Sequence, residues 1–401
     1  MLNGAIHPAF SEVGETLRKI LPKGAMGGAA VCVWHRGEKV VDIWAGTRND
    51  DGAPWEEDTL SISFSTTKGV ASTLLHIYAD RGLIDYDAPV AAYWPEFAAG
   101  GKEAITVRHL MCHEAGLYAL TDIVEDASEM LDWAQMVRRF EEARPRHAPG
   151  ACHGYHGMTY GWLVGEVVRR VAGGKSFSDL IREEIAEPLE LDGLYCGMPE
   201  AELPRCAQLK ARGFDGPIEK KRERAQKVRA SAARTAKVLS FLHVRYDPRE
   251  SIDALVAPNM EELDFNSAEF RRASIPAANG QFTARSLAKV YACLAAGGAI
   301  NGTRLLSAEG VRAAARIQNR TFDRVIPAPM HWRLGYHRVF AVRGKAPAAF
   351  GHFGFGGSGA WADPDRDLAV ALTVNSGVGT PFGDARIARV GGAAIRCADR
   401  R

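Results

Sequence analysis

The chain has 401 residues, which corresponds to two or three average domains or to one large domain with an insertion. Lys and Arg number 50 against 48 Asp and Glu, and the resulting net charge of +2 argues against a dedicated binder of nucleic acid or another polyanion. The apolar fraction of 46% and the charged fraction of 24% exclude a disordered chain.

The N-terminal residues lack the basic and apolar regions of a secretory signal, and the seven cysteines are scattered without a C-x-x-C pair. We therefore expect reduced, mostly buried thiols in a cytoplasmic protein. The stretch 24–34 is too short and too rich in glycine to span a bilayer, so we expect no membrane partner.

The first elements in chain order are two strands and a helix. Residues 27–46 are rich in β-branched and aromatic side chains around Arg36-Gly37, which predicts a hairpin with its turn there. Residues 65–69 carry Ser and Thr directly before the apolar run 70–79, which predicts a helix that begins near Ser65. We expect this helix to end at Arg81-Gly82.

The middle of the chain is mainly helical, and strands return near the C-terminus. Helical patterns cover 107–112, 127–143, 158–171, 177–185, 284–296 and 307–317. Strands are predicted over 332–340, 359–362 and 368–374, with a turn at 363–366 and a final helix over 383–397.

This order of elements predicts one α/β domain formed by both termini, with a mainly helical insertion. We assign 1–85, 155–215 and 280–401 to the α/β domain. The helical or lid domain takes 86–154 and 216–279.

The segment from Lys220 to Lys237 holds eight basic residues and a single acid, Glu223. An arm for nucleic acid is one interpretation of such a run. Because no aromatic residues alternate with the basic ones, we favour a solvated basic helix or loop and expect no nucleic-acid partner.

The residues that point most clearly to chemistry are Ser65 and Lys68. Side chains three residues apart lie on one face of a helix, and the N–H groups at its start stabilise negative charge. A serine hydroxyl becomes a nucleophile when a neighbouring base takes its proton, which Lys68 can do if its pKa is depressed. The alternative is that Ser65 only caps the helix and Lys68 is an exposed residue of its first turn.

Two further segments add to this pair. Tyr155, before the helix over 158–171, carries a phenol that can relay protons. The glycine-rich segment from His352 to Gly359 leads into a strand, where its amide groups can complete an oxyanion hole with the N–H of Ser65.

In this chain order, Ser65-Thr66-Thr67-Lys68, Gly154-Tyr155-His156 and His352-Phe353-Gly354 resemble the three motifs of the serine β-lactamase and penicillin-binding-protein superfamily. More narrowly, the chain resembles the β-lactamase-like carboxylesterases known as family VIII esterases. Stretches 105–117, 155–169 and 351–375 are also similar to that family, and the resemblance is weakest over 200–270.

The resemblance implies a mostly antiparallel sheet flanked by helices, with a helical domain and an active-site cleft between the two parts. It implies a serine hydrolase that cleaves carboxylic esters through an acyl-enzyme on Ser65, with Lys68 and Tyr155 as the proton-handling pair. The backbone N–H groups of Ser65 and Phe355 would form the oxyanion hole. No metal or organic cofactor is needed.

On the substrate side, His352 would stand where lactamases carry the Lys of their K-T-G motif. We expect His352, Gly354, Phe355 and His156 to contact a small-molecule ester. The second motif lacks the usual Asn, because it reads Tyr155-His156-Gly157, and a histidine is a weaker carboxylate anchor than a lysine. Both departures favour an ester over a β-lactam or a peptide.

Several other interpretations remain open or are disfavoured. A β-lactamase, a D-Ala-D-Ala peptidase, an acyltransferase and a binding protein without turnover all fit the same fold. A dinucleotide site at Gly354-x-Gly356-x-x-Gly359 is disfavoured, because a strand and not a helix should follow it. The pairs His109/His113 and His153/His156 lack a third zinc ligand, so we interpret the first pair as structural.

Overall fold

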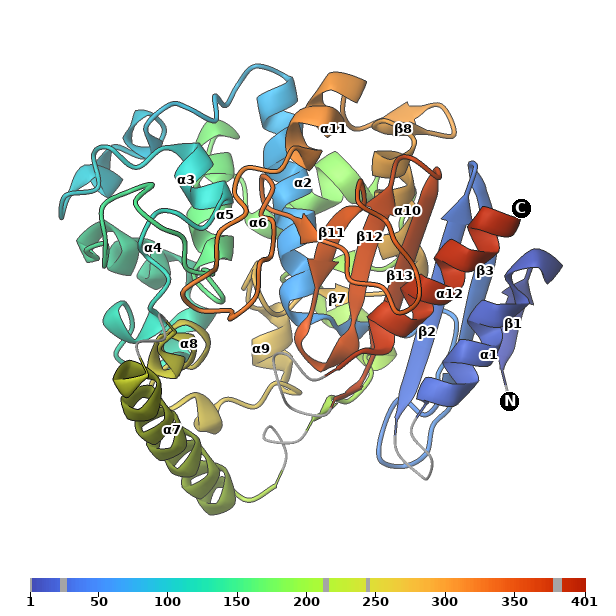
Figure 1. The fold of residues 1–401 in the computed structure, drawn as a ribbon, viewed down its shortest axis with the longest axis horizontal. Coiled ribbons are helices and arrows are strands. Elements are labelled where there is room, and N and C mark those ends of the chain that lie inside the picture. The colour runs from blue at the N-terminus through green and yellow to red at the C-terminus, as the bar shows by residue number, and fades with distance from the viewer. Residues whose placement is uncertain (1, 22–26, 212–215, 243–245, 378–383) are drawn as a thin grey trace.

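The computed structural model describes the chain apart from residues 1, 22–26, 212–215, 243–245 and 378–383. Its centre is a seven-stranded antiparallel sheet in the order β1-β3-β2-β13-β12-β11-β10 (Figure 1). In that order the strands are Asn3–Ile6, Glu38–Gly46, Gly28–His35, Leu368–Val374, Gly359–Asp363, Phe350–Phe353 and His337–Arg338.

The pairing of β2 with β13 joins the two ends of the chain, with Cys32 opposite Ala371. This confirms that both termini build one sheet. The domain boundaries themselves stay a prediction.

Both faces of the sheet are covered by helices, so β13 is buried along its whole length and consists almost entirely of apolar residues. Helices α1 (Ser11–Ile20) and α12 (Arg386–Arg400) lie side by side on one face (Figure 1). Helix α10 (Ala284–Ala295) packs on the other face, against β2, β12 and β13. Alternate residues of β2 accordingly enter different clusters, Val31 that of α12 and Cys32 that of α10.

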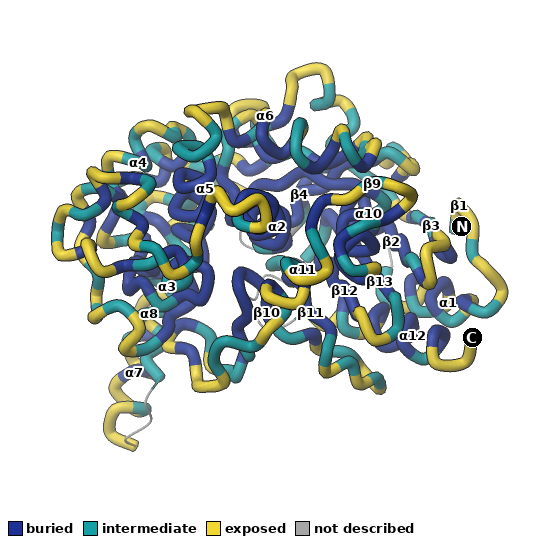
Figure 2. Tube along the Cα trace, turned by 90° about the horizontal axis from the view of Figure 1, so that it is seen from above, coloured by how far each residue is buried: buried dark blue, intermediate teal, exposed yellow. Residues whose placement is uncertain are grey.

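Helix α2 (Thr67–Asp80) runs through the interior between the sheet and the helical lobe, the group of helices that includes α4 (Trp133–Glu142) and α5 (Tyr160–Val171) (Figure 2). It contacts both α5 and β11, and its first twelve residues are all buried. A helix that is surrounded by protein tolerates no polar face, except where polar groups find partners. The remaining α-helices are α3 (Val107–Met111), α6 (Phe177–Ile181), α7 (Ile218–Phe241), α8 (Pro248–Leu255), α9 (Ala268–Arg272) and α11 (Ala308–Ala315).

Three small sheets complete the fold. A three-stranded one orders β4 (Ser61–Ile62), β7 (Gln281–Phe282) and β5 (Leu194–Tyr195). The two-stranded ones pair β14 (Ser376–Gly377) with β6 (Lys210–Ala211) and β8 (Ala299–Ile300) with β9 (Thr303–Arg304).

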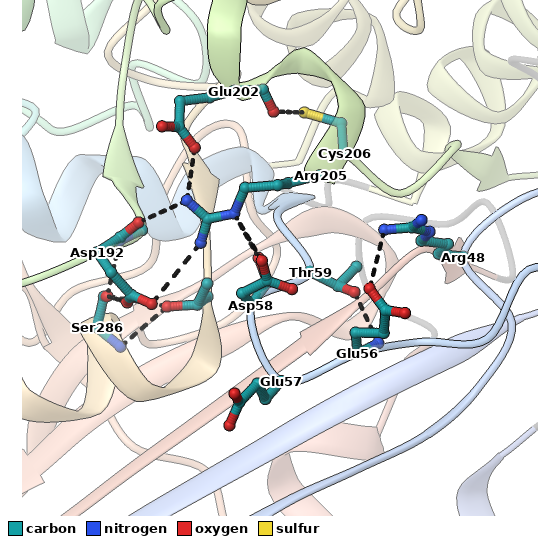
Figure 3. A network of polar contacts seen from close by, with 12 residues as sticks. Arg48, Glu56, Glu57, Asp58, Thr59, Asp192, Glu202, Arg205, Cys206 and Ser286 are labelled. Carbon is teal, nitrogen blue, oxygen red and sulfur yellow. Dashed lines mark hydrogen bonds and ion pairs between the residues drawn. The ribbon is translucent and has the colours of Figure 1, made fainter.

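A network of charged side chains holds the edge of the three-stranded sheet (Figure 3). Arg205 forms ion pairs with Asp58, Asp192 and Glu202. Asp192 in turn accepts a hydrogen bond from Ser286 of α10. The network therefore links the segment before β4 to the first turn of α10.

The hairpin, the central helix and the last two strands agree with the sequence predictions, whereas three predictions need correction. The expected strand over 332–340 is limited to β10, and the expected helix over 127–143 is broken at Asp132, which caps α4 through Gln135. Strand β11, which carries His352, was expected only as an entry to the next strand. A four-residue strand offers too short a pattern for detection.

All seven cysteines are free, and five of them are buried. Within the described parts of the chain, we find no helix with the length and apolar character needed to cross a bilayer.

Candidate active site

Ser65 lies in a tight turn between β4 and α2. From Thr59 to Tyr78, every residue except Ser65 is buried. Ser65 is the middle residue of a 3-10 helix, Phe64–Thr66, whose first N–H groups have no acceptor within the helix. Phe64 adopts a φ of +44°, a left-handed conformation that costs energy for a side chain with a Cβ. The turn therefore presents one hydroxyl from an otherwise buried segment.

Hydrogen bonds to a distant segment hold this turn in place. The hydroxyl of Thr67 donates to the carbonyl of Phe64 at 2.6 Å and accepts the N–H of Gly280 at 3.0 Å. The N–H of Ser63 donates to the carbonyl of Gly280 at 2.9 Å. The strained backbone before Ser65 is thus fixed by the residues that precede β7.

Lys68 is completely buried, and its Nζ has three polar neighbours. These are Ser65 Oγ at 3.0 Å and the carbonyl oxygens of Gly157 at 2.6 Å and Ala277 at 2.9 Å. Burial places the pKa of Lys68 well below its usual range. A neutral amine has two N–H donors and one lone pair, and a carbonyl oxygen only accepts. In the neutral form, which the lowered pKa favours, the two carbonyls take both donors and the lone pair is left for the Ser65 hydroxyl.

Tyr155 precedes α5, and its ring centroid lies 4.9 Å from Lys68 Nζ. Burial raises the pKa of the Tyr155 phenol, and a hydrogen bond with Ser65 opposes this rise only in part. The phenol is consequently protonated at neutral pH. Ser65, Lys68 and Tyr155, which are 90 residues apart in sequence at their extremes, thus meet at one point in the structure.

The loop that holds Tyr155 depends on a residue that sequence reasoning missed. Asp323 is buried, and its Oδ1 accepts the backbone N–H of Tyr155 at 3.0 Å, together with two N–H groups of its own loop. Its Oδ2 accepts the indole N–H of Trp332 at 3.0 Å. Asp323 stands in a loop with no motif around it, so only its contacts mark it.

Four buried histidines surround the same point. They are His113, His156, His337 and His352. Burial lowers the pKa of each, to about 3 for His156 and about 4 for His337. The histidines are therefore neutral at pH 7 and place no fixed positive charge beside Lys68.

Of the two histidines proposed to contact substrate, only His352 has a ring nitrogen without a partner. The Nδ1 of His352 lies 3.1 Å from the carbonyl of Phe353, and its buried Nε2 has no hydrogen bond within the described structure. His156, in contrast, bonds the carbonyl of Gly154 and the N–H of Leu117. Neither nitrogen of His156 can bind a substrate without losing a backbone partner.

Strand β11 places the ring of His352 beside that of Tyr155, with centroids 6.1 Å apart, and the residues after it pass close to the Ser65 turn. A Cβ on Gly354 would lie 2.2 Å from the carbonyl oxygen of Ser63, so only glycine lets the chain pass this close to the turn. The ring of Phe355 meets that of Phe64 edge to face at 5.2 Å. Ser65 and Phe355, the two residues predicted to form an oxyanion hole, therefore belong to two segments that are in close contact.

The dinucleotide and metal sites considered from the sequence can be compared with the structure. Gly354 to Gly359 connects two antiparallel strands, β11 and β12, through a single 3-10 turn, Phe355–Gly357, whereas a dinucleotide motif would open an α-helix. His109 accepts the N–H of Thr106 in a capping box, in agreement with its structural interpretation. Among the described residues, no group of three His, Cys, Asp or Glu side chains is arranged to hold a metal ion.

Comparisons with known proteins extend over nearly the whole chain. The family model described as Beta-lactamase matches residues 13–394. The esterase/beta-lactamase LipL of Mycobacterium tuberculosis is 38% identical over 375 residues, which cover 93% of this chain and 82% of that protein. The crystal structure of a family VIII carboxylesterase is 34% identical with a TM-score of 0.85, and the match covers 99% of this chain and 100% of that one. A penicillin-binding protein homolog from Caulobacter crescentus is 33% identical with a TM-score of 0.84 at the same coverage.

Proposed function

The chain belongs to the beta-lactamase family, and on this premise we propose that it is a carboxylesterase that forms an acyl-enzyme on Ser65. The observation that carries this proposal is the arrangement at Lys68, whose Nζ lies 3.0 Å from the Ser65 hydroxyl and has two carbonyl partners that take both N–H donors of its neutral form. The relatives and neighbours that are named as esterases favour an ester substrate.

The first step transfers the Ser65 proton to Lys68 as Oγ attacks the ester carbonyl. Lys68 is suited to this role because burial lowers its pKa and so favours the neutral form, which can accept a proton. The negative charge that develops on the carbonyl oxygen is stabilised by the N–H groups of Ser65 and Phe355. Donors that are fixed before the reaction need no reorganisation during it.

The second step breaks the bond to the alcohol. Tyr155 donates its phenolic proton to the leaving oxygen and regains one from the Lys68 ammonium, so the proton taken from Ser65 ends on the alcohol. The raised pKa of Tyr155 suits a donor, because the phenol holds its proton until an alkoxide forms beside it. Water then attacks the acyl group by the same route in reverse and restores Ser65.

The packing at Gly157 supports an ester rather than a β-lactam or a peptide. This position carries an Asn in the motif of the lactamases and peptidases that the sequence resembles. Here a Cβ on Gly157 would lie 2.4 Å from Leu255 and 3.0 Å from the carbonyl of Ala254, both of α8. Helix α8 therefore fills the space that an amide side chain would need.

The test compares kcat/KM on p-nitrophenyl esters with that on nitrocefin. We expect faster turnover of the esters, and we expect Ser65→Ala to lower ester turnover by at least ~10³-fold. Mass spectrometry of enzyme quenched during turnover should find the acyl group on the peptide that contains Ser65. Ser63→Ala, which removes a buried hydroxyl from the same segment, is the matched control. It should still form the acyl-enzyme during turnover.

Faster turnover of nitrocefin would contradict the ester preference. An unchanged ester rate in Ser65→Ala would contradict the nucleophile and favour a binding protein. Transfer of the acyl group to an added alcohol in preference to water would identify an acyltransferase. Location in the cytoplasm remains part of this proposal, and fractionation of cells that express the protein would check it.

A further inference from the structure

Helix α7 differs from the rest of the molecule in how little of it is covered. It is 24 residues long, or about 36 Å, and only Ala232 and Ala236 are buried. It packs on α8 and on the short helix Met260–Glu262, and it projects from the helical lobe at the lower left of Figure 1. Most of its surface is therefore open to solvent (Figure 2).

The charge of the protein is concentrated on this helix. Within Ile218–Phe241, eight residues are basic and two are acidic, a net charge of +6, whereas the whole chain carries +2. The remaining residues therefore sum to −4. In the described structure only Arg222 and Lys227 of these eight form ion pairs, with Glu262 and Glu223.

The outward face of α7 continues from basic to apolar side chains. Because the helix turns once every 3.6 residues, the side opposite Ala232 and Ala236 carries one continuous row of exposed residues. In chain order the centre of this outward face consists of Lys220, Glu223, Lys227, Ala230, Arg234, Val238 and Phe241, and Arg224 and Lys237 lie on its two flanks. Val238 is 58% exposed and Phe241 82%, and the next residue, Leu242, is 59% exposed.

We propose that this outward face docks the protein on an anionic lipid surface. The basic residues would lie against the phosphate headgroups, while Val238, Phe241 and Leu242 enter the boundary with the acyl chains. A nucleic acid fits the row less well, because it would use aromatic residues between the cations. The only aromatic residue of the helix, Phe241, lies beyond the last cation.

This docking differs from the expectation that the chain has no membrane partner, which rested on the absence of a spanning segment. A helix that lies on a bilayer needs an exposed amphipathic face and no long apolar run. The docked helix would also lie near the candidate active site, because α8 contacts α7 and also packs against Gly157, whose carbonyl is a partner of Lys68.

The test is co-sedimentation of the full chain with vesicles, which requires no turnover and is therefore independent of the proposed function. We expect binding to vesicles of phosphatidylcholine mixed with phosphatidylglycerol, little binding to pure phosphatidylcholine, and weaker binding at high salt. The variant K220Q/R224Q/R234Q should lower the partition coefficient by at least about tenfold. The variant V238S/F241S should also lower the partition coefficient. Binding by this variant should remain sensitive to salt, because its cations are intact.

The matched control is R18Q/K19Q/R312Q, which removes three exposed cations without ion pairs elsewhere in the described structure. It should bind vesicles like the original protein, and all three variants should hydrolyse a water-soluble ester at the original rate. Equal binding to neutral vesicles, no binding to anionic ones, or an equal loss in the control would overturn the proposal. Displacement of the vesicles by a single-stranded polynucleotide that binds more tightly would overturn it in favour of a nucleic acid.

Discussion

The indole of Trp332 stacks on the phenol of Tyr155, with the ring centroids 5.4 Å apart and the planes at 9°. Asp323 accepts a hydrogen bond from the Trp332 indole and another from the Tyr155 backbone. One buried carboxylate thus fixes both the main chain of Tyr155 and the surface on which its ring rests. The position of the phenol beside Ser65 and Lys68 depends on this arrangement.

Replacing Lys68 by Gln should remove the base and keep the local hydrogen bonds. The amide N–H groups of Gln can donate to Gly157 and Ala277, but the amide nitrogen accepts no proton from Ser65. We expect kcat/KM on a p-nitrophenyl ester to fall by roughly 10²–10⁴-fold while the circular dichroism spectrum is unchanged. An activity close to that of the original protein would contradict the assignment of Lys68 as base.

The pH dependence of kcat/KM should report the protonation state of Lys68. Because burial lowers the pKa of Lys68, we expect the free enzyme to hold the neutral base at neutral pH and to lose it as the pH falls through the lowered pKa. We therefore expect a plateau around pH 7 and a decline on the acidic side. A rate that still rises up to about pH 10.4, the ordinary lysine value, would show a charged Lys68 at pH 7.

Replacing Tyr155 by Phe should keep the stacking on Trp332 and remove the proton donor. The loss should be greatest for alkyl esters, whose alkoxide must be protonated as it leaves, and smaller for p-nitrophenyl esters. We expect roughly 10²–10⁴-fold on ethyl esters from steady-state kinetics. Tyr118→Phe, whose hydroxyl donates to Glu250 instead, is the control, and equal losses on both ester types would argue against proton donation.

Replacing Asp323 by Asn should weaken the support of Tyr155. The Asn amide oxygen can still accept N–H groups of the backbone, but its NH₂ group would face the Trp332 indole N–H, and two donors cannot pair. We expect the free energy of unfolding in urea to fall by about 1–3 kcal/mol, and kcat on ethyl esters to fall with little change in KM.

A double-mutant cycle separates this contact from a general effect on packing. In the Trp332→Phe background, which lacks the indole donor, Asp323→Asn should cost less than it does alone. Strictly additive losses would mean that the bond between the two side chains does not contribute.

The buried histidines should make the fold sensitive to acid. Burial lowers the pKa of His76 from 6.5 to about 4. Between these values the unfolded chain binds a proton that the folded chain does not, so stability is lost as the pH falls from about 6.5 towards 4. For a fully buried histidine such as His76, this amounts to about 2 kcal/mol between pH 7.5 and pH 5.

Urea denaturation at these two pH values measures this loss. His76→Gln should reduce the difference between pH 7.5 and pH 5, because one titrating group is gone. A difference as large as in the original protein would contradict the contribution of His76.

Some elements of the fold were predictable because a short stretch of sequence contains all the residues that determine them. The hairpin around Arg36-Gly37 and the helix after Ser65 need only neighbouring residues to form. Strand β11, in contrast, is four residues long and exists because β10 and β12 lie on either side of it. The helix break at Asp132 depends on the hydrogen bond by which Asp132 caps α4. Composition alone does not distinguish an aspartate that caps a helix from one inside a helix.

By itself, the sequence determined the candidate nucleophile, its lysine and the tyrosine, because their spacing and chain order are local patterns. Only the tertiary structure decided the environment that surrounds these three side chains. The carbonyls that orient Lys68 belong to residues 89 and 209 positions away, and Asp323 lies 168 positions from Tyr155. The lowered pKa of Lys68 has the same origin, because desolvation depends on what surrounds the amine in space and not on its neighbours in sequence.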